Sequence, residues 1–172
     1  MEYLLNHHKG LKLIKIPEKA NVTVLQPESM PVRETLSNML DLALHNARFI
    51  AQLRKKNPSR IAIVIPDETQ PVPLEALLSN IIQQLFHALP SITPPAVTII
   101  LGNGLQPPPN REMIDRILSS SMIRSCNIVA HVAHGARMKD FGITRRGTPV
   151  RINAAFGEAD FKMVIGLIEP HQ

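Results

Sequence analysis

The sequence predicts an α/β fold with three layers: a mostly parallel, Rossmann-like sheet, helices on both of its faces, and an antiparallel edge at the N-terminus. Three observations support this class. Unbroken apolar runs alternate with stretches of helical periodicity, β-branched residues gather in these runs, and proline-containing polar loops follow them. Strands that are apolar throughout are typical of a parallel sheet covered on both faces, with right-handed crossovers between strands.

The composition fits one ordinary domain. With 172 residues and 44% hydrophobic content, we expect residues 1–172 to form a single domain. There is no apolar run of about 18 residues and no export-signal layout at the start, so we expect a cytoplasmic protein without a membrane partner. The lone Cys126 can form no internal disulfide, and we expect it to be a small buried residue.

The N-terminal third predicts a strand pair and a helix. Residues 11–16 and 22–25 show near alternation, end at prolines, and are expected to pair at an edge of the sheet. Apolar residues then recur at helical spacing from Leu36 to Leu53, which predicts one long amphipathic helix running to about Lys55. Asn57-Pro58 marks its end.

The remaining sequence repeats a unit of strand, polar loop and helix. Strands are predicted at 61–65, 96–101, 127–132, 150–153 and 162–168, with helices beginning near Pro73 and Asn110. A glycine-rich stretch spans 142–149. Ligands of parallel sheets bind beyond the carboxyl ends of the strands. That rule selects the loops after Pro66, after Leu101 and after His131, and the segment 169–171.

The net charge of +5 raises the question of an anionic macromolecular partner. Much of this charge lies in residues 54–60, around an Asn-Pro-Ser turn, where a solvated loop is the preferred interpretation. Binding to exposed bases also requires aromatic stacking platforms, yet the chain has five Phe, one Tyr and no Trp. Nucleic acid is therefore kept as a minor alternative and is not the expected partner.

The loop at residues 67–71 offers a carboxylate, a hydroxyl and an amide directly before a predicted helix. Free amides at a helix start attract phosphate or carboxylate groups, and Thr69 adds a further donor. The alternative is that Asp67 or Thr69 merely caps the helix. Gly102 and Gly104 permit a sharp turn or a close ligand approach, but neither a dinucleotide fingerprint nor a P-loop is present.

Three of the seven histidines lie at the ends of predicted strands: His131 inside or near the end of one, His134 just after it, and His171 at the end of the last. The others lie near the terminus or within helices, where surface or packing roles are expected. Each of the three is either a hydrogen-bonded structural residue or a catalytic one. No close pair has the spacing of a helical zinc site, so no metal-ligating residue is assigned.

Taken in order, several segments resemble the N-terminal domain of nickel-dependent lactate racemases, over roughly residues 10–172. Residues 67–71 read Asp-Glu-Thr-Gln-Pro where the family typically reads Asp-x-Thr-Arg-Pro, and 104–107 read Gly-Leu-Gln-Pro where it reads Gly-Leu-His-Arg. The other matching pieces are His131, residues 142–150 with Asn153, residues 158–160 and residues 165–171. The order and spacing of the set carry the resemblance.

The resemblance implies a two-domain enzyme that binds a nickel pincer nucleotide between its domains. A 2-hydroxy acid would lose hydride to the cofactor while a histidine removes the hydroxyl proton, giving a keto acid that is reduced from either side. The resemblance places His171 and Gln106 at the two catalytic positions. It places Asp67, Thr69, Gln70, Gly104 and Leu105 at cofactor-binding positions, and His131 and Thr148 at substrate-binding positions.

Three departures from the family pattern bear on activity. Gln106 has no useful basicity near neutral pH, and Gln70 lacks the bidentate cationic donor of an arginine. The family's cofactor-tethering lysine and a nickel-binding histidine follow the segment that ends in His171, so the C-terminal domain is absent from these residues. We therefore expect no cofactor on this chain alone and no activity from it alone.

Two hypotheses stay open at this point. In the first, a partner chain supplies the missing C-terminal domain and the joint site acts on a small 2-hydroxy acid. In the second, the fold is a degenerate, non-catalytic module that binds a small anion or a protein partner.

Overall fold

The computed structural model describes residues 2–7, 10–25, 35–44, 47–134 and 137–168. Contacts group the chain into two compact units, residues 1–33 and residues 34–172. The expectation that residues 1–172 form one domain stays a prediction.

The smaller unit holds an antiparallel hairpin of β1 (Glu2–His7) and β2 (Gly10–Lys15), with Glu2 opposite Lys15 and His7 opposite Gly10. An N-terminal antiparallel pair is present as a two-stranded sheet of its own, but the predicted pairing of residues 11–16 with 22–25 is wrong, because residues 22–25 have no regular structure. A turn closed by Ala20 N–H and the Pro17 carbonyl (3.0 Å) interrupts the chain before these residues. Pairing of sequence neighbours across a short loop also costs less chain entropy.

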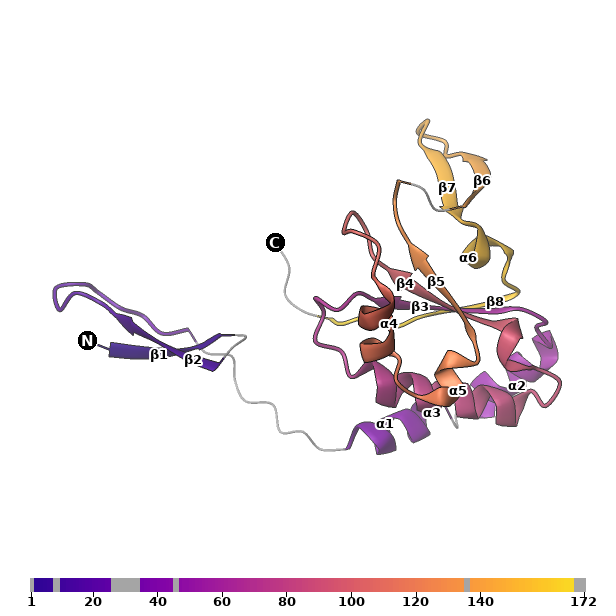
Figure 1. Ribbon diagram of the computed structural model, residues 1–172, viewed down its shortest axis with the longest axis horizontal. Coiled ribbons are helices and arrows are strands. Elements are labelled where there is room, and N and C mark those ends of the chain that lie inside the picture. The colour runs from indigo at the N-terminus through magenta and orange to yellow at the C-terminus, as the bar shows by residue number, and fades with distance from the viewer. Residues whose placement is uncertain (1, 8–9, 26–34, 45–46, 135–136, 169–172) are drawn as a thin grey trace. The chain divides into compact units, whose positions relative to one another are not determined.

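The larger unit contains the predicted parallel sheet, in the order β5-β4-β3-β8 (Figure 1). Its strands are β3 (Ile61–Pro66), β4 (Val97–Gly102), β5 (Asn127–His131) and β8 (Phe161–Val164). All three pairings are parallel. β8 is shorter than the predicted strand 162–168, although Ile165 N–H still donates to the Val64 carbonyl at 2.8 Å.

Two helices precede β3, and three helices and a short 3-10 turn connect β3, β4 and β5. They are α1 (Leu36–Leu44), α2 (Ala47–Lys56), α3 (Leu74–Ala88), η1 (Pro94–Ala96), α4 (Arg111–Ile117) and α5 (Ser121–Arg124). The single helix predicted to run from Leu36 to about Lys55 is thus two helices, with residues 45–46 between them outside the described part of the chain.

One face of the sheet carries the main hydrophobic core. Alternate residues of β3 and β4, such as Ile63 and Ile99, are fully buried there. They pack with Leu78 and Ile82 of α3 and with Leu53 of α2. Because successive strand residues point to opposite faces, this alternation fixes which side chains remain for the second face.

The second face is covered more sparsely. There α6 (Ala154–Glu158) packs Ala155 and Phe156 against Ala62 and Ile100, on the side of the sheet opposite α1, α2, α3 and α5 (Figure 1). Helices therefore lie on both faces, as predicted, but unevenly. Asn153 caps α6, because its Oδ1 accepts from Ala155 N–H at 3.0 Å.

A second antiparallel hairpin, β6 (Met138–Ile143) with β7 (Pro149–Asn153), precedes α6. β7 was predicted and β6 was not. The glycine-rich stretch forms the turn between them: Thr144 N–H donates to the Thr148 carbonyl at 2.9 Å, and Gly147 has φ +82°. A positive φ explains the glycine at that position.

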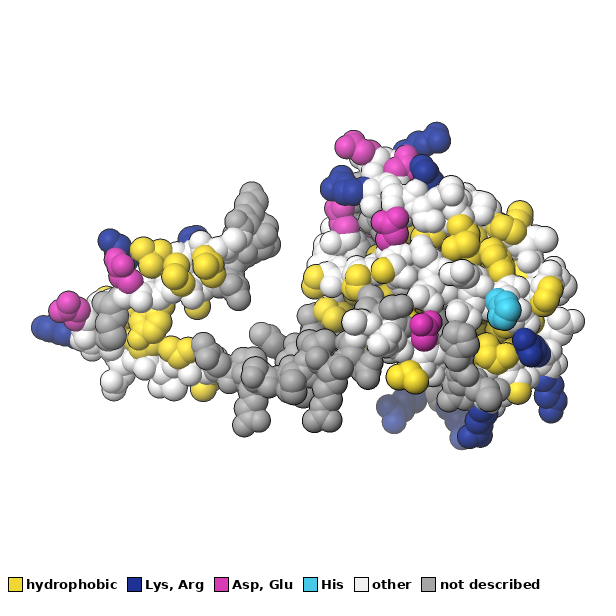
Figure 2. Space-filling view, turned by 90° about the horizontal axis from the view of Figure 1, so that it is seen from below, with side chains coloured by type: hydrophobic (Ala, Val, Ile, Leu, Met, Phe, Trp, Pro, Cys, Tyr) yellow, Lys and Arg dark blue, Asp and Glu magenta, His cyan; other side chains and the backbone are white. Residues whose placement is uncertain are grey.

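Charged side chains are distributed in small groups. In the view of Figure 2, Lys and Arg lie in separate clusters at the border of the larger unit and do not form one continuous patch on that face. Within the described residues, no helix is long and apolar enough to cross a bilayer. The expectation against a nucleic-acid partner stays a prediction.

Asp160 ties the start of β8 to the start of β3. Its Oδ2 accepts from the Ser59 N–H (3.0 Å), the Ser59 hydroxyl (2.7 Å) and the Arg60 N–H (2.9 Å). These hydrogen bonds, the Ser59 hydroxyl bond first, lower the pKa of the Asp160 carboxyl below its ordinary value.

We predict that Asp160 makes stability fall in acid. Because its pKa is lower in the folded state than in the unfolded chain, its contribution is full above the unfolded pKa of about 4 and is lost as pH falls through the folded pKa. Urea unfolding at pH 7 and pH 3 should show a smaller drop for Asp160→Asn than for the unchanged protein, with Ser59→Ala intermediate. An equal drop in all three would contradict this.

A second prediction concerns the thiol. Cys126 is 7% exposed, and burial raises its pKa to about 11. Since the thiolate is the reactive form, labelling by a disulfide reagent at pH 8 should be at least 100-fold slower in the folded protein than in urea. Fast stoichiometric labelling of the folded chain would show that Cys126 is accessible after all.

Candidate functional site

The candidate site lies where β3 and β4 end. Pro66 of β3 pairs with Gly102 of β4, so the loops that follow the two strands leave the sheet side by side. Between them is a cavity of about 270 Å³. It is lined by Asp67, Glu68, Thr69, Asn103, Gln106, Pro107 and Pro108. Three predicted site residues, Asp67, Thr69 and Gln106, therefore meet at one cavity.

Asp67 organises its own loop. Its Oδ1 accepts from the Thr69 N–H at 2.9 Å and from the Thr69 hydroxyl at 2.5 Å, while its carbonyl accepts from the Gln70 N–H at 3.3 Å. This is the side-chain-to-backbone turn that aspartate favours. The capping alternative is wrong: α3 begins at Leu74 after Pro73, with no side-chain cap on this described helix.

Asn103 shapes the second loop. Its side chain is 4% exposed, and its Nδ2 donates to the Gln106 carbonyl (3.2 Å) and to the Pro107 carbonyl. Gln106 N–H in turn donates to the Asn103 carbonyl at 3.0 Å. Sequence reasoning did not single out Asn103. The available signal was a turn-forming amide between two glycines at the end of a buried strand.

Gly104 and Leu105 take different positions in the same loop. Gly104 has φ +54°, and its carbonyl accepts from the Ala133 N–H at 3.2 Å, which connects this loop with the one after β5. Leu105 is 81% exposed. Neither residue belongs to the described lining of the cavity of Asp67, so their assignment to cofactor binding stays a prediction.

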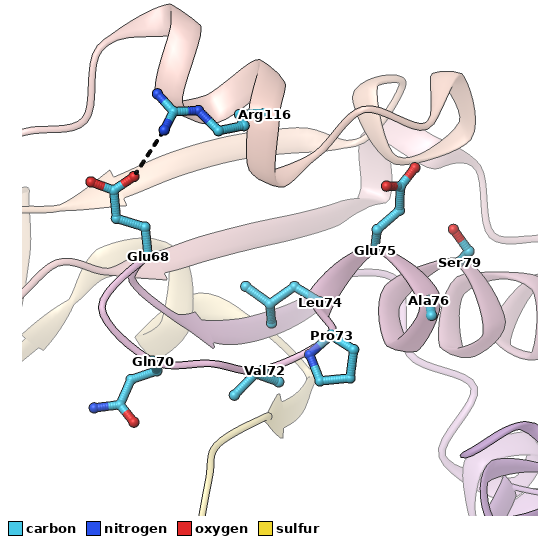
Figure 3. Close-up of a pocket in the computed structure, with 9 residues that line it drawn as sticks. All are labelled: Glu68, Gln70, Val72, Pro73, Leu74, Glu75, Ala76, Ser79 and Arg116. Carbon is cyan, nitrogen blue, oxygen red and sulfur yellow. Dashed lines mark ion pairs between the residues drawn. The ribbon is translucent and has the colours of Figure 1, made fainter. Parts of the chain in front are cut away.

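Gln70 lines a neighbouring cavity of about 670 Å³ at the start of α3 (Figure 3). Figure 3 shows Glu68 reaching toward Arg116 of α4, an ion pair of 4.0 Å, while Gln70 points to the other side of the loop. Glu68 lines both cavities. Gln70 does not belong to the described lining of the cavity that Asp67, Thr69 and Gln106 share.

His131 and Thr148 lie elsewhere. His131 ends β5 and lines a third cavity, where its Nδ1 is 3.3 Å from Asn153 Nδ2. Thr148 is exposed in the turn between β6 and β7, with its N–H donating to Thr144 Oγ1 at 3.1 Å. His171 lies outside the described residues. The structure therefore does not bring His131 and Thr148 to the cavity of Asp67, and the assignment of His171 stays a prediction.

The chemistry at the shared cavity is that of binding and positioning. A carboxylate, a hydroxyl and a primary amide supply both hydrogen-bond donors and acceptors. The amide of Gln106 does not take up a proton near neutral pH, so it is unsuited to general base catalysis.

The described side chains do not fit a nickel centre. No group of three or more His, Cys, Asp or Glu side chains that would hold a metal ion occurs in the part of the chain that the structure covers. Nickel in proteins needs several nitrogen, sulfur or oxygen ligands in a defined geometry. Any metal ligands would have to come from elsewhere.

Comparisons with known proteins agree on one relationship. The sequence profile of the lactate racemase N-terminal domain matches residues 7–172. A search of curated proteins finds no match. Among solved structures, the lactate racemase apoprotein from Thermoanaerobacterium thermosaccharolyticum superposes with a TM-score of 0.79 at 19% identity, over 99% of this chain and 40% of the other. The profile match, which covers nearly the whole sequence, shows that the chain belongs to the lactate racemase N-terminal domain family.

Proposed function

We propose that this chain forms one wall of an active site that interconverts the enantiomers of a 2-hydroxy acid. The observation that carries the proposal is the convergence of Asp67, Thr69 and Gln106 on one cavity at the carboxyl edge of the sheet. Ligand sites of open α/β sheets lie at this edge. Family membership supports the reaction class, with the family's nickel pincer nucleotide as the implied cofactor.

The second wall is proposed to come from a lactate-racemase-type C-terminal domain. This chain spans 40% of the length of the solved racemase that it superposes on. The described residues offer no group of three or more metal-ligating side chains, and we propose that the second domain holds the metal. A protein partner of this kind is therefore part of the proposal.

The residues of this chain are proposed to bind and orient the substrate. The hydrogen bond from the Thr69 hydroxyl to Asp67 leaves the lone pairs of Thr69 Oγ1 to accept from a substrate hydroxyl. The amide N–H groups of Gln106 can donate to a substrate oxygen. Proton removal needs a different group, and His171 is proposed for that role.

The first test is complementation. Purified chain is mixed with the C-terminal domain of a lactate racemase that carries its cofactor, and chiral chromatography follows a panel of 2-hydroxy acids. We expect enantiomer interconversion in the mixture and none with either part separately. Asp67→Ala should reduce the rate at least tenfold without preventing complex formation.

Size-exclusion chromatography is the control for assembly in this experiment. A loaded complex that forms but converts no acid of the panel would contradict the racemase proposal. That outcome would favour the degenerate, non-catalytic module that binds a partner.

The second test restores an imidazole. In the loaded complex, Gln106→His places a general base at the cavity, and general base catalysis is typically worth about 10²-fold or more. We expect the initial rate from one enantiomer to rise at least tenfold, with the pH profile of that direction gaining a limb near pH 6–7. Gln106→Leu, which offers no base, serves as the matched control and should show no such limb. A pH profile unchanged by Gln106→His would show that this position lies away from the reacting carbon.

A further inference from the structure

A separate cavity of about 360 Å³ opens on the sparsely covered face of the parallel sheet. Most of its lining is apolar. The lining residues are Val64, Ile100, Gly102, His131, Met138, Arg151, Ile152, Asn153, Phe156 and Val164. They differ from those of the cavity at Asp67, although Gly102 and Asn103 are neighbours in the chain.

The uneven packing of the two faces creates this cavity. At the strand ends on this face, Val64 of β3 lies opposite Val164 of β8. Gly102 of β4 likewise lies opposite His131 of β5. Hairpin β6–β7 contributes Met138, Arg151 and Ile152. At Gly102 a Cβ would lie 3.2 Å from the Ile65 carbonyl oxygen, so a larger residue there would crowd the backbone of β3.

The hydrogen bonds around Asn153 fix the state of the His131 ring. Asn153 Oδ1 accepts from the Ala155 N–H, so its Nδ2 must be the atom that faces His131 Nδ1 at 3.3 Å. An amide NH₂ only donates, and therefore Nδ1 accepts. The neutral ring then carries its proton on Nε2. His131 lines the cavity, and in this tautomer its Nε2–H is the ring group that can donate to a ligand.

Arg151 supplies a cation at the same cavity. Its Nε lies 3.8 Å from Asp140 Oδ2, and the two side chains are 69% and 66% exposed. An ion pair that long and that exposed contributes little and leaves the terminal guanidinium nitrogens available. No acidic side chain belongs to the lining in the described part of the chain. The polar groups here favour an anion that accepts hydrogen bonds.

We propose that this cavity binds a small carboxylic acid with an aliphatic or aromatic body, at a site separate from the one at Asp67. The carboxylate accepts from His131 Nε2–H and from the Arg151 guanidinium. The body of the ligand packs on Ile100, Phe156 and Val164. Planar, bidentate recognition of carboxylates is the usual role of arginine, and apolar pockets with a few convergent polar groups are typical ligand sites.

The probe for the test is 4-methylpentanoate, compared with its neutral isostere 4-methylpentanamide and with acetate. Binding to the full chain is followed by calorimetry and by amide chemical-shift changes. We expect the acid to bind at least tenfold more tightly than either analogue, with shifts centred on β7 and the end of β5. Equal affinity for acid and amide, or no binding of the acid at 10 mM, would overturn the proposal.

Matched variants locate the ligand without disturbing the core. Val164 is 71% exposed, so Val164→Glu should fold and should abolish binding by repulsion, whereas Val164→Gln should retain it. Arg151→Gln should weaken binding at least tenfold, and Arg145→Gln, in the exposed turn of the same hairpin, should not. Asp67→Ala should leave this binding unchanged even if the racemase proposal fails. Equal effects of the two Val164 variants, or loss of binding in Asp67→Ala, would contradict a separate carboxylate site.

Discussion

The parallel pairing of β3 with β4 is the constraint on which the candidate site depends. It sets Ile61 against Val97 at one end and Pro66 against Gly102 at the other. Two loops that are far apart in the sequence therefore leave the sheet at adjacent points, and side chains from both line one cavity. Each loop is then shaped locally, by the carboxylate of Asp67 in one and by the amide of Asn103 in the other. The sheet sets where the two loops begin, and the side chains of Asp67 and Asn103 set the conformation of each loop. Both are needed for Asp67, Thr69 and Gln106 to line one cavity.

The two faces of the sheet have different roles because they are packed differently. The face under α2 and α3 is closed, with residues such as Ile63, Leu78 and Ile99 fully buried, and it accounts for most of the apolar burial that stabilises the unit. The other face has a small core of Ala62, Ile100 and Ala159 beneath a five-residue helix. Beyond α6, the ends of the strands meet hairpin β6–β7 across open space. The apolar burial that stabilises the unit thus lies mainly on the face under α2 and α3, and the opposite face has room for a cavity.

Whether a helix or strand could be predicted from the sequence depends on how much of it is buried. Strands 61–65 and 96–101 are largely buried on both faces, so every position except Thr98 is apolar and the pattern is unambiguous. β6 is exposed along its whole length, so burial gave no apolar pattern by which to detect it. α6 has five residues and is held by its cap and by contacts with the sheet, which no periodicity over a short window reveals. At the site, the rule that ligands lie beyond carboxyl strand ends led to the loops of Asp67 and Gly104, and the family resemblance led to Gln106, but neither assigns a direction to side chains. Gln70 therefore had to be located from the structure, which places it on the other side of its loop.

The charges at the two cavities make opposite demands on an anionic ligand. Asp67 and Glu68 line the cavity between the loops, and the position where the family typically has arginine is Gln70. Arg116 lies 4.0 Å from Glu68 but does not belong to the described lining of this cavity. A hydroxy acid held there by this wall would bring its carboxylate toward like charge, which costs free energy unless a cation from a second domain faces it. At the other cavity Arg151 and the N–H of His131 already provide the donors that a carboxylate needs. Among the described lining residues, the first cavity thus carries two carboxylates and no cation, whereas the second carries Arg151 and no carboxylate.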